Sequence, residues 1–225
     1  MPSPVIYALV VLIWGTTWYA IKFQLGVVAP EISLVYRFGI ATICVFIYAR
    51  LTGSPLNLSW RDHRFVALQG LTLFCLNYWM TYLSTQYLTS GLVAVIFTTI
   101  ILANMINARL IFGTKLEARV VIAAAAGMLG VALLFLPELQ VAMGDRKVIH
   151  GALFALAATY LASLGNMAAM RNTRGGLPVL TVNAYGMAYG TIALALIAAI
   201  RGTPIAFDPS WPYIVSLLYL ALAGT

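Results

Sequence analysis

Arg37 is the only charged residue that lies well inside an apolar segment of this 225-residue sequence. It stands about four residues, or roughly 6 Å along a helix, from the start of the segment Ser33–Ala49. A charge in an apolar segment is costly, so a function is considered first, and Arg37 could dock the carboxylate of a ligand. A structural role stays open, in which its stem snorkels to a polar surface or its guanidinium bonds helix-end carbonyls.

Aromatic and hydroxyl side chains recur at helical spacing on four other apolar segments. Residues three or four apart share a helix face, so these side chains form stripes. A buried phenol needs a partner, which a water-filled cavity supplies, and ring faces suit a flat solute or an organic cation. Helix packing is the other interpretation of each stripe. The candidate substrate-binding residues are Trp14, Thr17, Trp18, Arg37, Asn77, Tyr78, Tyr82, Tyr160, Ser163, Asn166, Met167, Tyr185 and Tyr189.

The acidic residues all fall in the predicted connections between apolar segments. A proton relay inside a membrane needs an embedded ionisable group, so the sequence predicts no carboxylate relay. The six acids are Glu31, Asp62, Glu117, Glu138, Asp145 and Asp208.

The sequence holds no constellation typical of catalysis or of metal binding. His63 and His150 lie in predicted connections, and no carboxylate pair or His/Cys cluster occurs at ligand spacing. Cys44 and Cys75 lie inside apolar runs, where a thiol usually serves as a small packing residue. We therefore predict that the chain is not an enzyme and that it carries neither a metal nor a cofactor.

The elements that carry these residues are predicted to be membrane-spanning helices. The chain is 62% hydrophobic and 8% charged, with a mean hydropathy of +0.95. A soluble domain has about 25% charged residues, so these side chains cannot cover a water-facing surface. Apolar runs of about 17 to 23 residues without alternation favour helices over barrel strands. The predicted fold class is an all-α polytopic membrane protein.

Seven complete spans and the start of an eighth are predicted. The eighth begins near Pro212 and reaches Thr225, about 20 Å as a helix against a hydrocarbon core of about 30 Å. We therefore expect the chain to stop inside this span. The first seven are Val5–Phe23, Ser33–Ala49, Phe65–Tyr87, Leu92–Phe112, Val120–Leu136, Gly151–Met170 and Leu180–Ile200.

Lysine and arginine gather on one side of the predicted membrane. The connections after spans two, four and six hold eight of them, and the other connections hold four. Subtracting the acids leaves +6 on one side and zero on the other, and Arg37 completes the net charge of +7. Basic residues favour the cytoplasmic side, so we predict an inner-membrane protein with a cytoplasmic N-terminus. The positive charge is then a topology signal, and no nucleic-acid partner is expected.

One short motif occurs twice, in Arg50–Trp60 and in Arg201–Trp211. Both copies contain Gly, a hydroxyl residue, Pro and an aliphatic residue, and both end in Ser-Trp. The offset of about 149 residues aligns spans one to three with spans six to eight, which defines a five-helix repeat. An odd number of helices inverts the second copy. We predict a first repeat over residues 1–140 and a partial, inverted second repeat over residues 148–225, stopping after the start of its third helix. Two generic turns with interfacial tryptophans are the alternative.

Small residues at helical spacing predict close helix packing. The pairs are Gly186/Gly190, Ala123/Gly127 and Ala126/Gly130, and Asn104 and Asn107 are expected to bond across helices.

Several stretches match, in order and spacing, the pattern of one group of transporters. They include Trp14–Trp18, Tyr36–Phe38, Thr89–Ile96 and Ile111–Gly113. In these stretches the chain resembles the drug/metabolite transporter superfamily in its ten-helix EamA-like form, and it looks most like the YddG-type aromatic amino-acid exporters. It departs from that pattern at Thr98-Thr99, near the usual proline of helix four, and at Thr114, in place of a glutamate.

The resemblance implies two five-helix bundles around a central cavity, with helices three, four, eight and nine crossing at the centre. It also implies an exporter of small hydrophobic metabolites, such as aromatic or other neutral amino acids or flat organic cations, that works by alternating access. The expected partners are the lipid bilayer and a small-molecule substrate, and the oligomeric state stays open. The alternatives are a transporter of the same superfamily for nucleotide-sugar or quaternary-cation solutes, and a structural membrane subunit that transports nothing.

Overall fold

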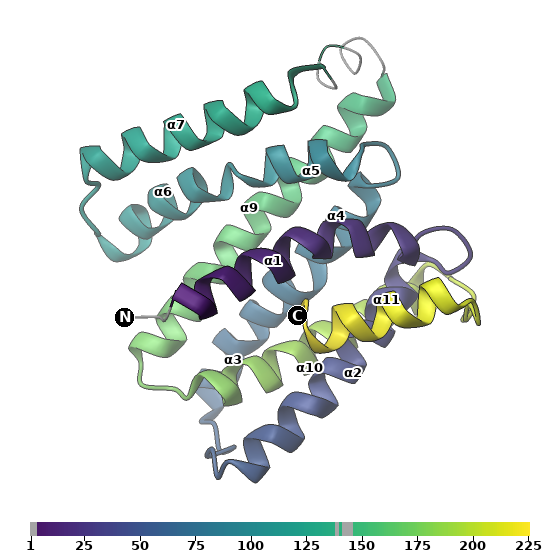
Figure 1. Ribbon diagram of the computed structural model, residues 1–225. Helices are drawn as coiled ribbons and strands as arrows, with labels where there is room; N and C mark the ends of the chain where they lie inside the picture. The colour runs from purple at the N-terminus through teal and green to yellow at the C-terminus, as the bar shows by residue number, and fades with distance from the viewer. Residues whose placement is uncertain (1–3, 138–139, 141–145) are drawn as a thin grey trace.

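The computed structural model describes residues 4–137, 140 and 146–225 as a bundle of helices (Figure 1). Helices make up 80% of the described residues, which include no strand. Five helical stretches are long and apolar enough to cross a membrane. The predicted class, an all-α polytopic membrane protein, is confirmed.

Every predicted span coincides with one helix or one helical run. The 3₁₀ turn η1 (Lys22–Gln24) follows α1, and the π-helical segment η2 (Gly70–Leu76) joins α3 to α4. Glu138 and Asp145, assigned to the connection after α7, lie outside the described residues. In chain order the α-helices are α1 (Pro4–Ile21), α2 (Pro30–Leu51), α3 (Trp60–Gln69), α4 (Asn77–Ser84), α5 (Ser90–Phe97), α6 (Ile100–Phe112), α7 (Ala118–Leu134), α9 (Arg146–Arg174), α10 (Val179–Ile200) and α11 (Trp211–Leu222).

The position of Glu31 corrects the sequence analysis. Pro30 opens α2, where its fixed φ suits the first helical position, so Glu31 lies in the first turn and not in a connection. Its side chain is buried and accepts hydrogen bonds from Arg201 Nε at 3.2 Å and from Thr203 Oγ1 at 2.7 Å. This carboxylate is therefore paired, at the very end of a span.

The fourth predicted span is interrupted at Thr98 and Thr99, between α5 and α6. Thr98 Oγ1 donates to Val95 O at 2.6 Å, and Thr99 Oγ1 donates to Ile96 O at 2.7 Å. Hydroxyls that bond preceding carbonyls compete with the backbone ladder and bend helices. The chain thus breaks this helix with threonines, near the place where the related pattern has a proline.

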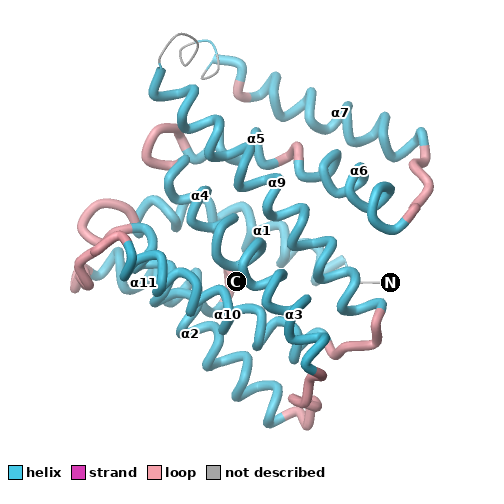
Figure 2. The backbone as a smooth tube through the Cα atoms, turned by 180° about the vertical axis from the view of Figure 1, so that it is seen from behind, coloured by secondary structure: helices cyan, strands magenta, loops and turns pink. Residues whose placement is uncertain are grey.

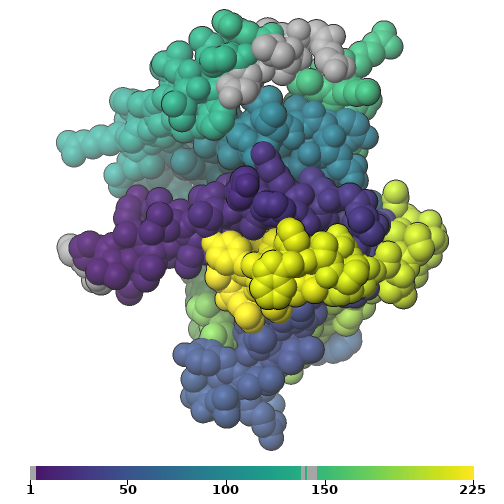
Figure 3. All heavy atoms as spheres, turned by 45° about the vertical axis from the view of Figure 1, so that its right-hand side comes forward, coloured from purple at the N-terminus to yellow at the C-terminus, as the bar shows by residue number. Residues whose placement is uncertain are grey.

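The helices pack around an antiparallel pair formed by α2 and α10. The segment η2 lies against both α10 and α9, and α4 runs along α9. Figure 2 shows α9 crossing between the α5–α7 group and the group formed by α2, α3 and α10. On the face opposite to the one seen in Figure 2, α1 and α11 lie side by side (Figure 3). The helix α7 stands at the edge of the bundle and is largely exposed.

The two copies of the sequence motif form the same turn. After α2, Gly53 adopts a φ of 69°, and after α10, Gly202 adopts a φ of 64°. These left-handed values favour glycine. In both turns the N–H of the next residue, Ser54 or Thr203, donates to the carbonyl five residues earlier at 2.9 Å.

The hydroxyl in each of these turns reaches the start of the other helix. Ser54 Oγ, after α2, lies 3.4 Å from Thr181 Oγ1 in the first turn of α10. Thr203 Oγ1, after α10, donates to Glu31 in the first turn of α2. The contacts at the two ends of the α2–α10 pair are therefore reciprocal.

Glycines allow η2 to approach its neighbours closely. A Cβ at Gly190 of α10 would lie 2.8 Å from Phe74 Cβ, and one at Gly186 would lie 3.2 Å from the Phe74 ring. On α9, a Cβ at Gly165 would lie 2.6 Å from Leu73 Cβ. The predicted packing role of Gly186/Gly190 is confirmed.

The small-residue pairs of α7 behave differently. A Cβ at Gly127 or Gly130 would meet no heavy atom of the described residues within 4 Å. The prediction that these pairs pack against a helix is thus not met in the part of the chain that the structure describes.

Replacing Gly165 or Gly190 by alanine is expected to destabilise the protein by about 1–3 kcal/mol, because the new methyl group overpacks the contact with η2. Gly127→Ala is the matched control and should be neutral or stabilising, since alanine is the better helix former by about 1 kcal/mol. The measurement is thermal unfolding of the purified protein in detergent. Equal melting temperatures for all three variants would contradict the close contact of Gly165 and Gly190 with η2.

Candidate functional site

Arg37 is completely buried between α2, α4 and the residues that follow α11. Its Nη2 donates to Gly224 O at 2.8 Å, and its Nε donates to Thr225 Oγ1 at 2.9 Å. The guanidinium carbon lies 4.7 Å from the centre of the Tyr78 ring. Among the described residues, no carboxylate forms an ion pair with it. The positive charge is therefore held by a carbonyl, a hydroxyl and a ring face.

Five buried side-chain polar atoms on α2 and α4 have no hydrogen-bond partner among the described residues. They are Arg37 Nη1, Thr42 Oγ1, Asn77 Oδ1, Trp79 Nε1 and Tyr82 OH. Tyr82 is fully buried and lies within the electrostatic reach of Arg37. A buried polar group without a partner costs about 1–3 kcal/mol, and such groups in native proteins usually meet water or a ligand. The Arg37 centre, meaning Arg37, Tyr78 and Tyr82, thus has unused hydrogen-bonding capacity.

The three residues of the stripe predicted on α1 do not lie together. Trp18 packs edge-on against Phe97 of α5, with ring centroids 5.5 Å apart. Thr17 lies beside Gly224, the residue that Arg37 binds. Trp14 is 68% exposed and joins neither group.

The polar residues predicted on α9 contact α6. Asn107 Nδ2 donates to Ser163 Oγ at 2.9 Å, and Asn166 Nδ2 donates to Asn104 Oδ1 at 3.3 Å. The prediction that Asn104 and Asn107 bond across helices is confirmed. Met167 is buried next to this contact, and it lines a cavity of about 370 Å³ together with Asn104 and Asn166.

The two tyrosines predicted on α10 lie against α3, and Tyr160 of α9 does not join a cluster. Tyr185 and Tyr189 stack with ring centroids 6.5 Å apart. Tyr189 OH lies 2.7 Å from His63 Nδ1, and the Tyr185 ring meets His63 edge-on. Tyr160 is 54% exposed.

A polar network that the sequence analysis missed joins α3, α9 and α10. Asn172 Nδ2 donates to Gln69 Oε1 at 3.0 Å, and Gln69 Nε2 lies 3.4 Å from Asn183 Oδ1. Arg171 pairs with Asp62 at 3.0 Å. No local spacing signals such a network, because each bond joins residues more than 100 positions apart.

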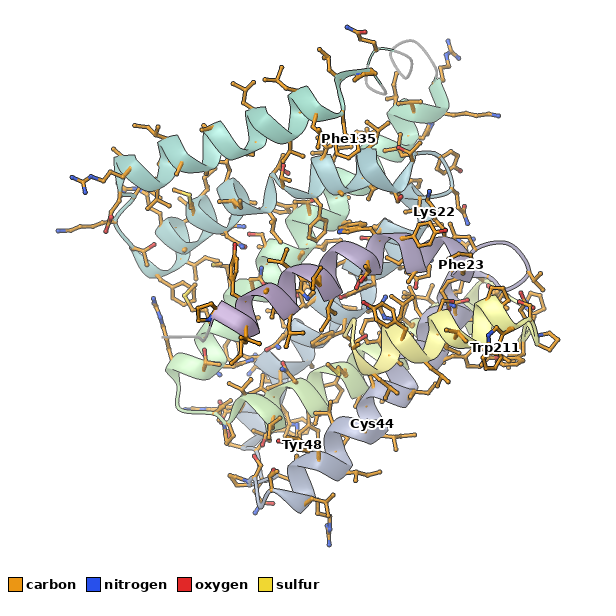
Figure 4. The ribbon with its side chains drawn as sticks, in the orientation of Figure 1. Lys22, Phe23, Cys44, Tyr48, Phe135 and Trp211 are labelled. Atoms are coloured by element: carbon orange, nitrogen blue, oxygen red, sulfur yellow. The ribbon has the colours of Figure 1, made fainter. Side chains whose placement is uncertain are left out.

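The remaining reactive residues form no cluster. Both cysteines are free, with Cys75 buried as expected and Cys44 exposed on the outer face of α2 (Figure 4). The expectation that Cys44 packs internally is therefore wrong. No group of three His, Cys, Asp or Glu side chains comes together within the described ranges.

Comparison with known proteins agrees with the arrangement of these helices. A family model described as "EamA-like transporter family" matches residues 3–136, which is more than half of the chain. The chain belongs to the EamA-like transporter family. This membership agrees with the prediction of a transporter and not of an enzyme.

The EamA-like chain is shorter than the relatives that it matches. It is 28% identical over 111 residues to protein PagO of Salmonella typhimurium, covering 49% of this chain and 36% of that protein. It is 22% identical over 204 residues to an uncharacterized transporter of Clostridium kluyveri, covering 88% of this chain and 65% of that one. The chain thus spans from about a third to two thirds of these relatives.

One solved structure has the same fold. A crystal structure aligns over 97% of this chain and 73% of its own, with a TM-score of 0.71 and 17% identity. At this identity the likeness establishes the fold alone.

Replacing Asn172 by leucine is expected to destabilise the protein by about 1–3 kcal/mol, because Gln69 Oε1 would stay buried without a donor. Adding Gln69→Leu to this variant should cost less than the sum of the two single substitutions, since both partners are then removed. Thermal unfolding of the four proteins measures the coupling, with Thr173→Val on the exposed side of α9 as the control. Strict additivity would contradict a direct bond.

Proposed function

We propose that this EamA-like protein exports small hydrophobic metabolites across the inner membrane, with aromatic or other neutral amino acids as the substrate class. The observation that carries the proposal is the Arg37 centre. A buried guanidinium beside the rings of Tyr78 and Phe38 is expensive inside a membrane bundle. It supplies what such a solute needs, namely a cation for the carboxylate and ring faces for the side chain.

The charge of the Arg37 centre favours amino acids over organic cations. The described residues place no carboxylate against Arg37, so the centre keeps a net positive charge. A quaternary cation would be repelled there, whereas a carboxylate would complete the hydrogen bonds of Nη1 and of Tyr82 OH.

We further propose that transport follows alternating access between inverted repeats, residues 1–140 and the partial repeat 148–225. The reciprocal contacts of Ser54 with Thr181 and of Thr203 with Glu31 support this relationship. Rocking of one repeat against the other around a midplane site is the motion that such architectures use. The threonine break between α5 and α6 supplies an element that can bend. In this proposal the N-terminus is cytoplasmic, as the basic connections suggest.

We also propose that transport needs no carboxylate proton relay. Among the described acids, Glu31 is the most buried, and it is bound to Arg201 and Thr203 at the end of α2. A carboxylate held in this way stabilises the α2–α10 contact.

Counterflow in proteoliposomes with labelled phenylalanine tests the substrate class. Tyr82→Phe should lower the exchange rate by about tenfold to a hundredfold, because a hydrogen bond to a charged group is worth about 1.5–3 kcal/mol. Arg37→Gln should lower it further. Tyr48→Phe, on the exposed face of α2 (Figure 4), is the matched control and should leave the rate unchanged. Unchanged exchange in Tyr82→Phe and Arg37→Gln would remove the Arg37 centre from the transport path.

An imposed pH gradient tests the absence of a proton relay. The initial rate of phenylalanine transport should be the same with and without the gradient, in the wild type and in Glu31→Gln. The substitution should lower the melting temperature instead, because Arg201 and Thr203 lose a charged partner. Strong stimulation by the gradient that Glu31→Gln abolishes would show that Glu31 carries protons.

A further inference from the structure

The cavity beside α6 differs from the Arg37 centre in its charges. It has a volume of about 370 Å³ and lies between α6, the first turn of α7, α9 and the link that joins α6 to α7. This volume falls within the range of small-molecule sites, about 300–1,000 Å³. Its lining includes both Lys115 and Glu117, two residues apart in the link.

Neither charged side chain of this cavity, Lys115 or Glu117, is engaged in an ion pair within the described part of the chain. Glu117 occupies the N-cap position of α7, yet its side chain accepts no capping hydrogen bond. Gly113, with a φ of 66°, ends α6 and starts the link to α7. The cavity therefore presents one free ammonium and one free carboxylate.

The rest of the cavity is mainly apolar, and its polar residues are Thr114 and the Asn104–Asn166 pair. Met105, Met167 and Met170 contribute thioether side chains, and the Asn104–Asn166 pair provides amide groups. Methionine sulfur makes favourable contacts with aromatic rings. These walls suit an apolar or aromatic body attached to the charged groups.

We propose that this cavity binds a zwitterion, with Lys115 holding its anionic oxygen and Glu117 holding its ammonium. A simple anion would meet Glu117, and a simple cation would meet Lys115, so either would gain less than a ligand that carries both charges. The proposal rests on the proposed function, since a free amino acid has this chemistry and the cavity lies at the end of the bundle that the basic connections assign to the cytoplasm. The headgroup of phosphatidylethanolamine carries the same pair of charges.

Equilibrium binding to the purified protein tests the charge pattern. The probes are L-phenylalanine and two analogues that each lack one charge, 2-phenylethylamine and 3-phenylpropanoate. Phenylalanine should bind at least about tenfold more tightly than either analogue, a difference of about 1.4 kcal/mol. Lys115→Gln should abolish its advantage over 2-phenylethylamine, and Glu117→Gln should abolish its advantage over 3-phenylpropanoate. Arg119→Gln, an exposed neighbour outside the cavity, is the matched control.

Native mass spectrometry distinguishes a bound lipid headgroup from a bound free amino acid. The protein is extracted for this measurement from membranes that contain phosphatidylethanolamine. If the wild type retains this lipid, both charge variants lose it, and phenylalanine binding is the same in all variants, the zwitterion in the cavity is the headgroup. If neither phenylalanine binding nor lipid retention changes in Lys115→Gln and Glu117→Gln, the proposal is overturned.

Counterflow on the same preparations separates this inference from the proposed function. Charge-dependent phenylalanine binding without any exchange would retain the zwitterion site and reject the exporter. Exchange by a protein whose binding ignores both charges would retain the exporter and reject the site.

Discussion

The antiparallel contact between α2 and α10 is the interaction on which the rest of the bundle depends. Inside a membrane no water can satisfy polar groups, so a contact between spans needs close packing and paired hydrogen bonds. This pair has both. At one end, Glu31 accepts hydrogen bonds from Arg201 and Thr203. At the other end, the hydroxyls of Ser54 and Thr181 lie 3.4 Å apart. The glycines of α10 then admit η2, and α9 packs on η2 through Gly165. The α2–α10 pair thus supports η2 and, through η2, α9.

Irregular backbone is concentrated in the third and fourth predicted spans. The π-helical segment η2 lies between α3 and α4, and Thr98-Thr99 separate α5 from α6. π-helical turns occur frequently at functional sites. Both irregular segments lie close to spans that carry buried polar groups, such as Tyr82 and Asn107. The parts of the bundle most able to change shape are therefore next to its polar centres.

The two candidate binding regions differ in their charges. The Arg37 centre is closed and carries one positive charge, whereas the cavity at the α6–α7 link is open and carries both signs. An amino acid taken up at the open cavity would meet both of its charged groups there. At the Arg37 centre only its carboxylate would find an opposite charge. Under the two proposals, the whole zwitterion would be bound near the surface and held less completely inside.

The sequence alone determined the spans and the family, because hydropathy and local motifs are properties of neighbouring residues. It also predicted that Gly186 and Gly190 pack closely against a neighbouring segment, since helical spacing places them on one face. Only the tertiary structure decided which face meets which partner. It paired Glu31 with Arg201, His63 with Tyr189 and Asn172 with Gln69, and it left Trp14 and Tyr160 exposed. Those outcomes depend on contacts between helices far apart in the chain, where the rotation of each helix is fixed by its neighbours and not by its own residues.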